Sequence, residues 1–112
     1  MIKKYDINLY KNKKIDKSYK NIKGIYNNNN ISLIIDNIKT IIKENELIRE
    51  NDEFKFTIDF AEKTSNYSLK EHHLEYDIEV IEAKIERNNK EIIINYKIET
   101  NEELITIKIV ER

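Results

Sequence analysis

The chain has 112 residues, of which 39% are hydrophobic, and a formal net charge of −1 at pH 7. This length suits one domain with a single core. The chain has no Cys, which excludes a disulfide framework, a thiolate zinc site and a cysteine nucleophile. A single Gly cannot build a glycine-rich phosphate loop or a nucleophile elbow. We therefore expect one domain over residues 1–112 that is not an enzyme and needs no cofactor or metal.

The first residues, Met-Ile-Lys-Lys-Tyr-Asp-Ile, do not resemble a secretion signal. They contain neither a long apolar stretch nor a small-residue cleavage site. No later window has the apolar length needed to span a bilayer. The sequence therefore predicts a cytoplasmic protein without a membrane partner.

A first hairpin is predicted at the start of the chain. Tyr5, Ile7 and Leu9 alternate with polar residues, as in a strand with one buried face. Residues 11–14 form a polar turn, and a less regular strand follows over residues 15–26.

Charge is divided unevenly along the chain. Residues 1–43 hold ten Lys and three Asp, a net charge of +7, whereas residues 44–112 hold ten basic and 18 acidic residues, a net charge of −8. Six lysines interleave with tyrosines in the first hairpin, as in proteins that bind single strands. They are Lys11, Lys13, Lys14, Lys17, Lys20 and Lys23. Binding of RNA or single-stranded DNA is therefore the alternative function, although no Arg occurs there and oppositely charged halves can be neighbours in one sheet.

Residues 31–50 fit two secondary structures. Their isoleucines fall on one helical stripe, and Ser32 is a candidate helix cap. However, Asn37 and Asn45 interrupt the segment at strand-length intervals, and Ile favours strands over helices. The pattern leaves the choice between strands and a helix open.

The remainder of the chain reads as strands. Residues 54–60 alternate strictly after an Asn51-Asp52 turn, and the run that begins at Leu74 changes phase after Val80, which indicates a β-bulge. Asn88-Asn89 can adopt the positive φ values of a tight hairpin turn before a strand over residues 92–98. Asn101-Glu102 then separates that strand from a last one over residues 105–109.

Together these patterns predict about eight short antiparallel strands, arranged as an up-and-down barrel or a sandwich. Five segments carry a family resemblance: Gly24-Ile25-Tyr26, Lys39-Thr40-Ile41-Ile42-Lys43, Asn45-Glu46-Leu47-Ile48-Arg49, Ser65-Asn66-Tyr67 and Ile94-Asn95-Tyr96-Lys97-Ile98. They resemble the YwiB-like family of bacterial proteins of unknown function, which in turn resemble the calycin (lipocalin-like) β-barrels.

The resemblance covers roughly residues 15–111 in order. It implies that residues 31–50 are strands and that the fold is a small closed meander barrel, but it implies no activity. The sequence departs from the family at Lys70-Glu71-His72-His73, where the family tends to have a Gly-containing turn, and around residues 31–38, which are shorter here.

Two polar groups are candidate chemical sites. His72 and His73 are adjacent, and adjacent side chains of an extended chain point to opposite faces, so we expect a polar loop and no metal site. Glu75, Asp77 and Glu79 share one strand face and could serve glycosidic chemistry only with a facing acid. We expect them to form the solvated side of the strand.

An aromatic stripe is the strongest candidate for a ligand site. It consists of Phe54, Phe56, Phe60, Tyr76 and Tyr96. A barrel of eight strands is just wide enough to hold one small molecule and narrow enough to be filled by side chains, so a cavity and a packed core are both open. The leading hypothesis is a non-catalytic protein that binds an apolar small molecule or a protein segment. A homodimer through sheet edges is a further expectation.

Overall fold

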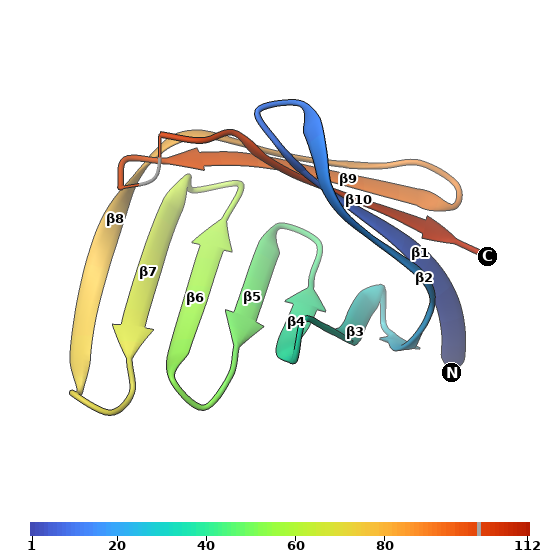
Figure 1. Ribbon diagram of the computed structural model, residues 1–112, viewed down its shortest axis with the longest axis horizontal. Coiled ribbons are helices and arrows are strands. Elements are labelled where there is room, and N and C mark those ends of the chain that lie inside the picture. The colour runs from blue at the N-terminus through green and yellow to red at the C-terminus, as the bar shows by residue number, and fades with distance from the viewer. Residues whose placement is uncertain (101) are drawn as a thin grey trace.

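Within residues 1–100 and 102–112, which the structure describes, the computed structural model forms ten antiparallel strands that close into one barrel (Figure 1). Each strand pairs with the next along the chain, and β1 also pairs with β10. The strands are β1 (Ile2–Lys11), β2 (Lys14–Asn27), β3 (Asn30–Ile35), β4 (Ile38–Ile42), β5 (Glu46–Glu50), β6 (Phe54–Asp59), β7 (Thr64–Leu69), β8 (Leu74–Arg87), β9 (Glu91–Ile98) and β10 (Ile105–Glu111).

The predicted all-β meander barrel is confirmed, but the number of strands was underestimated. Residues 31–50 form parts of three strands, β3, β4 and β5, and no helix. Asp36-Asn37 and the segment around Asn45 are the breaks between them, as the spacing of asparagines indicated. Among the described residues no helix is long and apolar enough to cross a membrane.

Tight turns join several of the strands. Both central residues have positive φ values in the Asn12-Lys13, Asn28-Asn29 and Asp36-Asn37 turns, which is the mark of a type I′ hairpin. The hairpin predicted at Asn88-Asn89 exists, but the predicted positive φ values there are wrong. This connection has three residues and is closed by a bond of 2.8 Å from the Asn88 amide to the Glu91 carbonyl, so it does not need a type I′ turn.

Two strands of 14 residues, β2 and β8, turn the corners of the barrel. The first half of β8 pairs with β7 up to Glu79, and its second half pairs with β9 from Val80 onward. The register shifts between Val80 and Glu82, where the sequence predicted a β-bulge. Residue 101 of the predicted Asn101-Glu102 break lies outside the described residues, and Glu102 lies between β9 and β10.

Closure of the barrel bears on the expected homodimer. Because β1 pairs with β10, the strand order has no terminal strand to offer a second copy. Unpaired backbone is confined to overhangs such as the first half of β2, which pairs with β1 alone. A homodimer through sheet edges stays a prediction restricted to those overhangs.

The two ends of the barrel differ in packing. One end, here called the closed end, carries the turns at residues 28–29, 43–45, 60–63 and 88–90, and the other, the open end, carries those at 12–13, 36–37, 51–53 and 70–73. Inward residues near the closed end are fully buried, such as Leu47 and Ile58, both 0% exposed. Toward the open end the inward residues Arg49 and Phe54 are only half-buried, and Phe56, between Phe54 and Ile58, is 7% exposed. The core therefore fills the closed end and thins toward the open end.

Candidate functional site

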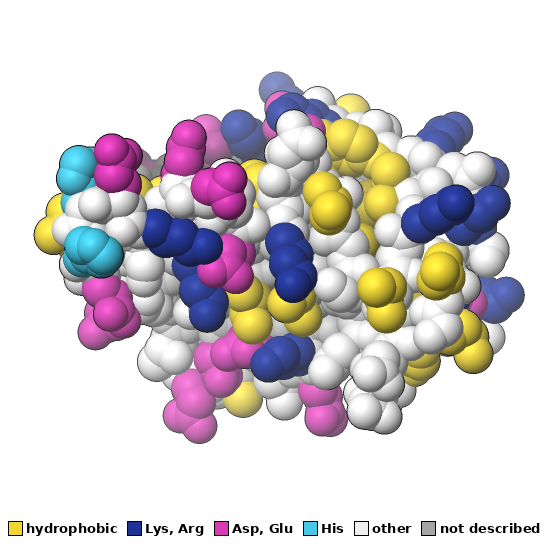
Figure 2. Space-filling model, turned by 90° about the horizontal axis from the view of Figure 1, so that it is seen from below, with side chains coloured by type: hydrophobic (Ala, Val, Ile, Leu, Met, Phe, Trp, Pro, Cys, Tyr) yellow, Lys and Arg dark blue, Asp and Glu magenta, His cyan; other side chains and the backbone are white. Residues whose placement is uncertain are grey.

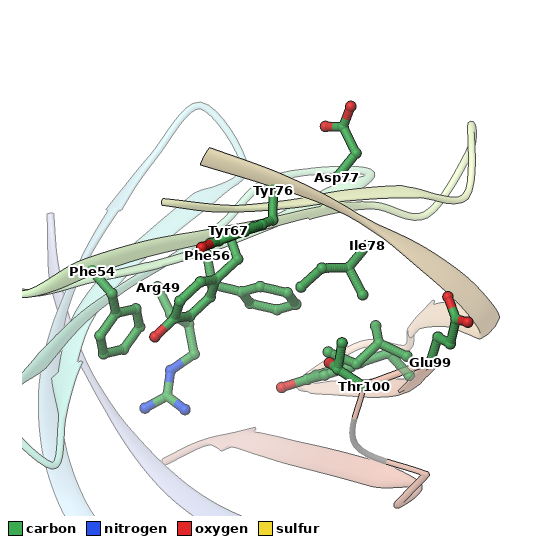
Figure 3. Close-up of a pocket in the computed structure, with 11 residues that line it drawn as sticks. Arg49, Phe54, Phe56, Tyr67, Tyr76, Asp77, Ile78, Glu99 and Thr100 are labelled. Atoms are coloured by element: carbon green, nitrogen blue, oxygen red, sulfur yellow. The ribbon is translucent and has the colours of Figure 1, made fainter. Parts of the chain in front are cut away.

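A pocket of ≈ 710 Å³ lies inside the barrel at the open end (Figure 3). Its wall is formed by aromatic side chains from four consecutive strands, which the period of two turns inward. These are Phe54 and Phe56 of β6, Tyr67 of β7, Tyr76 of β8 and Tyr96 of β9. The volume is in the range that holds a small organic ligand.

The aromatic side chains pack in pairs that shape the wall. Phe54 and Tyr67 stack with ring centroids 5.6 Å apart and an interplanar angle of 13°. Phe56 and Tyr96 lie 5.7 Å apart at 36°. Such pairs add to the stability gained by burial alone, so the wall is held in place before any ligand binds.

The pocket has an opening because the first half of β8 pairs with a neighbouring strand on one side only. The first half of β8 has β7 on one side and no ladder with β9, because that ladder starts only at Val80. The pocket opens between this half-strand and Glu99-Thr100, and Tyr76 at the mouth is 48% exposed. Figure 3 shows Arg49, Phe56 and Tyr67 on one side of the pocket with Glu99 and Thr100 across from them.

Arg49 brings a positive charge into the barrel. Its Nε donates to Thr40 Oγ1 at 3.3 Å and its Nη2 donates to the Ile35 carbonyl at 3.5 Å, both long for hydrogen bonds. Within the described part of the chain, no carboxylate lies within 4.0 Å of this guanidinium. Burial raises the pKa of the Tyr96 hydroxyl, and the charge of Arg49 acts in the opposite direction. Arg49 therefore lies near Tyr96 with much of its donor capacity free.

A polar clasp at the open end lies beside Arg49. Tyr19 donates its hydroxyl hydrogen to Asp36 Oδ1, and Lys17 Nζ donates to Asp36 Oδ2 at 2.9 Å. These two bonds, that of Tyr19 first, hold the pKa of Asp36 below its ordinary value, and the bond to Asp36 raises the pKa of Tyr19. A smaller pocket of ≈ 230 Å³ lies between this clasp and Arg49, and it shares Arg49 and Tyr96 with the larger pocket.

The structure brings four of the five predicted ligand residues to one pocket. Phe54, Phe56, Tyr76 and Tyr96 line it, whereas Phe60 packs in the core at the closed end, 7% exposed. Alternation predicts that a side chain points into the barrel, but it does not show which end of the barrel is packed and which is hollow. The sequence pattern therefore does not distinguish Phe60 from the other inward aromatic residues. A role for these residues in binding stays a prediction.

The predicted ligand set lacked several lining residues, and for two of these, Arg49 and Tyr67, a signal was present in the sequence. Arg49 is two residues from the buried Leu47 and therefore shares its inward face. Tyr67 has the same relation to the buried Ser65. A charged residue on an inward face is the stronger of these signals, because charges are rarely turned into a core without a partner.

The six predicted nucleic-acid lysines all lie exposed in the β1–β2 hairpin. Lys13 lies in the first turn, Lys11 faces Asp16 at 4.0 Å and Lys17 belongs to the clasp. Lys14, Lys20 and Lys23 lie exposed along β2. Of the tyrosines among them, Tyr19 is bonded to Asp36, and the ring of Tyr26 lies under the Lys3 ammonium at 4.1 Å. Neither ring is presented as a platform on which a base would stack.

The histidines and the acidic strand face lie on the surface. Figure 2 shows both imidazoles at one edge of the molecule, and His73, with a positive φ of 50°, lies in the turn between β7 and β8. Asn66 Nδ2 donates to Glu75 at 2.9 Å and to Asp77 at 3.0 Å on the solvated side of β8. Among the residues that the structure covers, no three His, Asp or Glu side chains gather as a metal-binding group.

Comparison with known proteins gave no relative: no family model, no curated protein and no solved structure matches the chain.

Proposed function

We propose that this protein is a non-catalytic binding protein that holds a small apolar molecule in the open end of its barrel. The proposal includes membership of the YwiB-like, calycin-type bacterial barrels. It also includes a cytoplasmic location, because a chain without cysteine forms no disulfides and so needs no oxidising compartment. The observation that carries it is the asymmetric interior, which is packed mostly with aliphatic side chains, together with Tyr5 and Phe60, at one end and holds the large aromatic-lined pocket at the other.

A binding role fits this site better than catalysis does. Among the described residues, the pocket lining contains no histidine, serine or cysteine, and the lining carboxylates Asp77 and Glu99 are exposed at the mouth. The lining is mostly aromatic and aliphatic, with a few polar groups that can orient a ligand, as in small-molecule binding sites. Burial of an apolar ligand there would contribute roughly 25 cal/mol for each Å² removed from water.

The test uses the neutral fluorophore N-phenyl-1-naphthylamine, whose emission rises in apolar surroundings. The protein has no Trp, so a Trp introduced by mutation also reports on its own surroundings. We expect saturable binding by the wild type and loss of about tenfold or more in affinity for Ile78→Trp, because the indole would occupy the pocket.

The matched control is Ile25→Trp, the same change at an outward position of β2 that is 58% exposed. This variant should bind the fluorophore as the wild type does, and far-UV circular dichroism should show the same strand content for both variants. Absence of saturable binding by the wild type, or equal binding by the two variants, would contradict the proposal.

The alternative, binding of RNA or single-stranded DNA, gains no specific observation from the structure. Two of the six lysines are engaged in ion pairs, Lys11 with Asp16 and Lys17 with Asp36, and the other four lie exposed in the β1–β2 hairpin. It stays a prediction whose mark is an affinity that falls steeply with salt concentration.

A further inference from the structure

The charges around the pocket are arranged with one cation inside and the acids outside. Arg49 is the only Lys or Arg in the lining, and it comes from the inward face of β5. In Figure 3 the Asp77 carboxylate points away from Arg49, and Glu99 lies across the pocket. Asp77 also accepts a hydrogen bond of 3.0 Å from Asn66 on the outer face. The interior of the pocket is therefore positive and its mouth negative.

Asp36 is the carboxylate best placed to neutralise Arg49, but it is already engaged. Both of its oxygens accept bonds from the clasp, one from Tyr19 and one from Lys17. An arginine has five N–H donors in a planar fork, and Arg49 uses two of them in long bonds to neutral oxygens. The fork therefore retains donors for an acceptor that enters the pocket.

Two of the hydroxyl groups in the same lining are those of Tyr67 and Tyr96. The structure shows no hydrogen bond from the hydroxyl of Tyr67 or of Tyr96 to any residue that it describes. Neither oxygen is among the fully buried side-chain atoms of the described residues, so each is accessible to a group that enters the pocket. A guanidinium with free donors beside two such hydroxyls is a set that suits a small anionic acceptor.

We propose that the ligand is an amphipathic monocarboxylate, with its carboxylate on the guanidinium of Arg49 and its apolar body against Phe56 and Ile78. This inference rests on the proposed function and names its ligand class. Carboxylate and guanidinium match as two parallel N–H···O bonds, which a neutral head group cannot form. A dianion such as a phosphate monoester is disfavoured, because the lining offers one cation and its mouth carries Asp77 and Glu99.

The experiment compares three ligands with the same ten-carbon chain: decanoate, decanol and decyl phosphate. Each competes with N-phenyl-1-naphthylamine for the wild type and for Arg49→Gln. We expect decanoate to bind the wild type about 10-fold to 100-fold more tightly than decanol does. Decyl phosphate should bind more weakly than decanoate. In Arg49→Gln the preference for decanoate over decanol should disappear, while decanol binds as before.

The matched control is Arg87→Gln, which removes the same charge at the closed end. There Arg87 donates to the Asn29 carbonyl at 3.2 Å and to the Lys43 carbonyl at 2.6 Å, away from this pocket. This variant should keep the preference for decanoate. If the loss of Arg87 abolished the preference as well, a general effect of net charge would replace the proposed contact.

The outcomes separate the two proposals. Equal binding of decanol and decanoate by the wild type, or an unchanged preference in Arg49→Gln, would overturn the carboxylate inference and leave an apolar binding site. Failure of the fluorophore and all three ligands to bind the wild type would remove the proposed function itself. If Arg49→Gln did not fold, judged by circular dichroism, the wild-type comparison of decanoate with decanol would decide alone.

Discussion

At the scale of single residues, the only glycine of the chain marks a close approach inside the barrel. Gly24 lies on the buried face of β2, and a Cβ there would be 2.9 Å from Tyr5 Cε2 and 3.3 Å from the Ser32 carbonyl oxygen. Tyr5 is 2% exposed and fills the closed end, so its ring has little room to move. We expect Gly24→Ala to lower the free energy of unfolding by about 1–3 kcal/mol, measured by urea denaturation.

A double-mutant cycle separates the contact with Tyr5 from a general cost at Gly24. In a Tyr5→Leu background the ring is absent, so Gly24→Ala should cost less, with a coupling free energy of at least about 0.5 kcal/mol. The contact with the Ser32 carbonyl remains in both backgrounds. The same cost in both backgrounds would show that the backbone of β3, and not the tyrosine ring, limits this position.

Residue-level features of the site were only partly readable from the sequence. Alternation identified the inward aromatic residues of β6 and β9, because one face of each strand is apolar and the other polar. It did not separate Phe60 from Phe54, since both face inward and the packing of strands distant in sequence decides which end of β6 is hollow. It could have found Arg49, whose parity matches that of Leu47.

At the scale of elements, the clasp ties the β3–β4 turn to the middle of β2. The bonds from Tyr19 and Lys17 lower the pKa of Asp36 relative to its ordinary value of 3.8. A carboxylate with a lowered pKa stabilises the fold above its ordinary pKa, and that contribution is lost as the pH falls through the folded-state value. We expect Asp36→Asn to cost about 0.5–1 kcal/mol at neutral pH, a small effect because the partners are partly exposed.

Urea denaturation at a series of pH values checks this dependence. The difference between the wild type and Asp36→Asn should be constant above pH 3.8 and shrink toward zero as the pH falls further. Asparagine tolerates the positive φ of 54° at this position, so the turn itself should be kept. Asp52→Asn, in the neighbouring β5–β6 turn, serves as the control. A difference for Asp36→Asn that did not change with pH would mean that the charge of Asp36 is not what stabilises the clasp.

Element assignment failed to resolve residues 31–50 for a physical reason. Periods of 3.6 and 2 place isoleucines on overlapping sets of positions in short windows, so one segment fits both a helix and strands. The outcome was set by tertiary pairing, in which β3, β4 and β5 join the ladder that runs from β2 to β6. Asp36 and Asn37, which accept positive φ values, allow two strands to be separated by only two residues.

At the scale of the whole molecule, closure pairs the first strand with the last, as the expected meander barrel requires, whereas the alternation alone left a sandwich open. The β1–β10 ladder runs from Tyr5↔Glu111 to Lys11↔Ile105, and the Arg112 amide donates to the Lys4 carbonyl at 2.8 Å. Figure 1 shows both termini on the same side of the barrel. Every strand has a neighbour on each side, so the strands form a closed ring. The chain termini could therefore lie in any of the turns without changing which strands are paired.

A circular permutant tests this view of the fold. Joining Arg112 to Met1 through about six Gly and Ser residues would span the short gap between the termini. New termini between Glu62 and Lys63, in the β6–β7 turn, would break no ladder. We expect strand content equal to that of the wild type by circular dichroism. The refolding rate should be within about tenfold of the wild-type rate, because the β1–β10 pair becomes local in sequence while the β6–β7 pair becomes distant.

The matched control permutant opens the chain between Asn95 and Tyr96. This cut falls inside β9, which pairs with both β8 and β10, so it interrupts two ladders and places chain ends beside the pocket wall. We expect this permutant to be unfolded or strongly destabilised. If both permutants folded equally well, intact strands would not be what defines the barrel. If neither folded, the order of the strands along the chain would matter for folding as much as the closed ladder does.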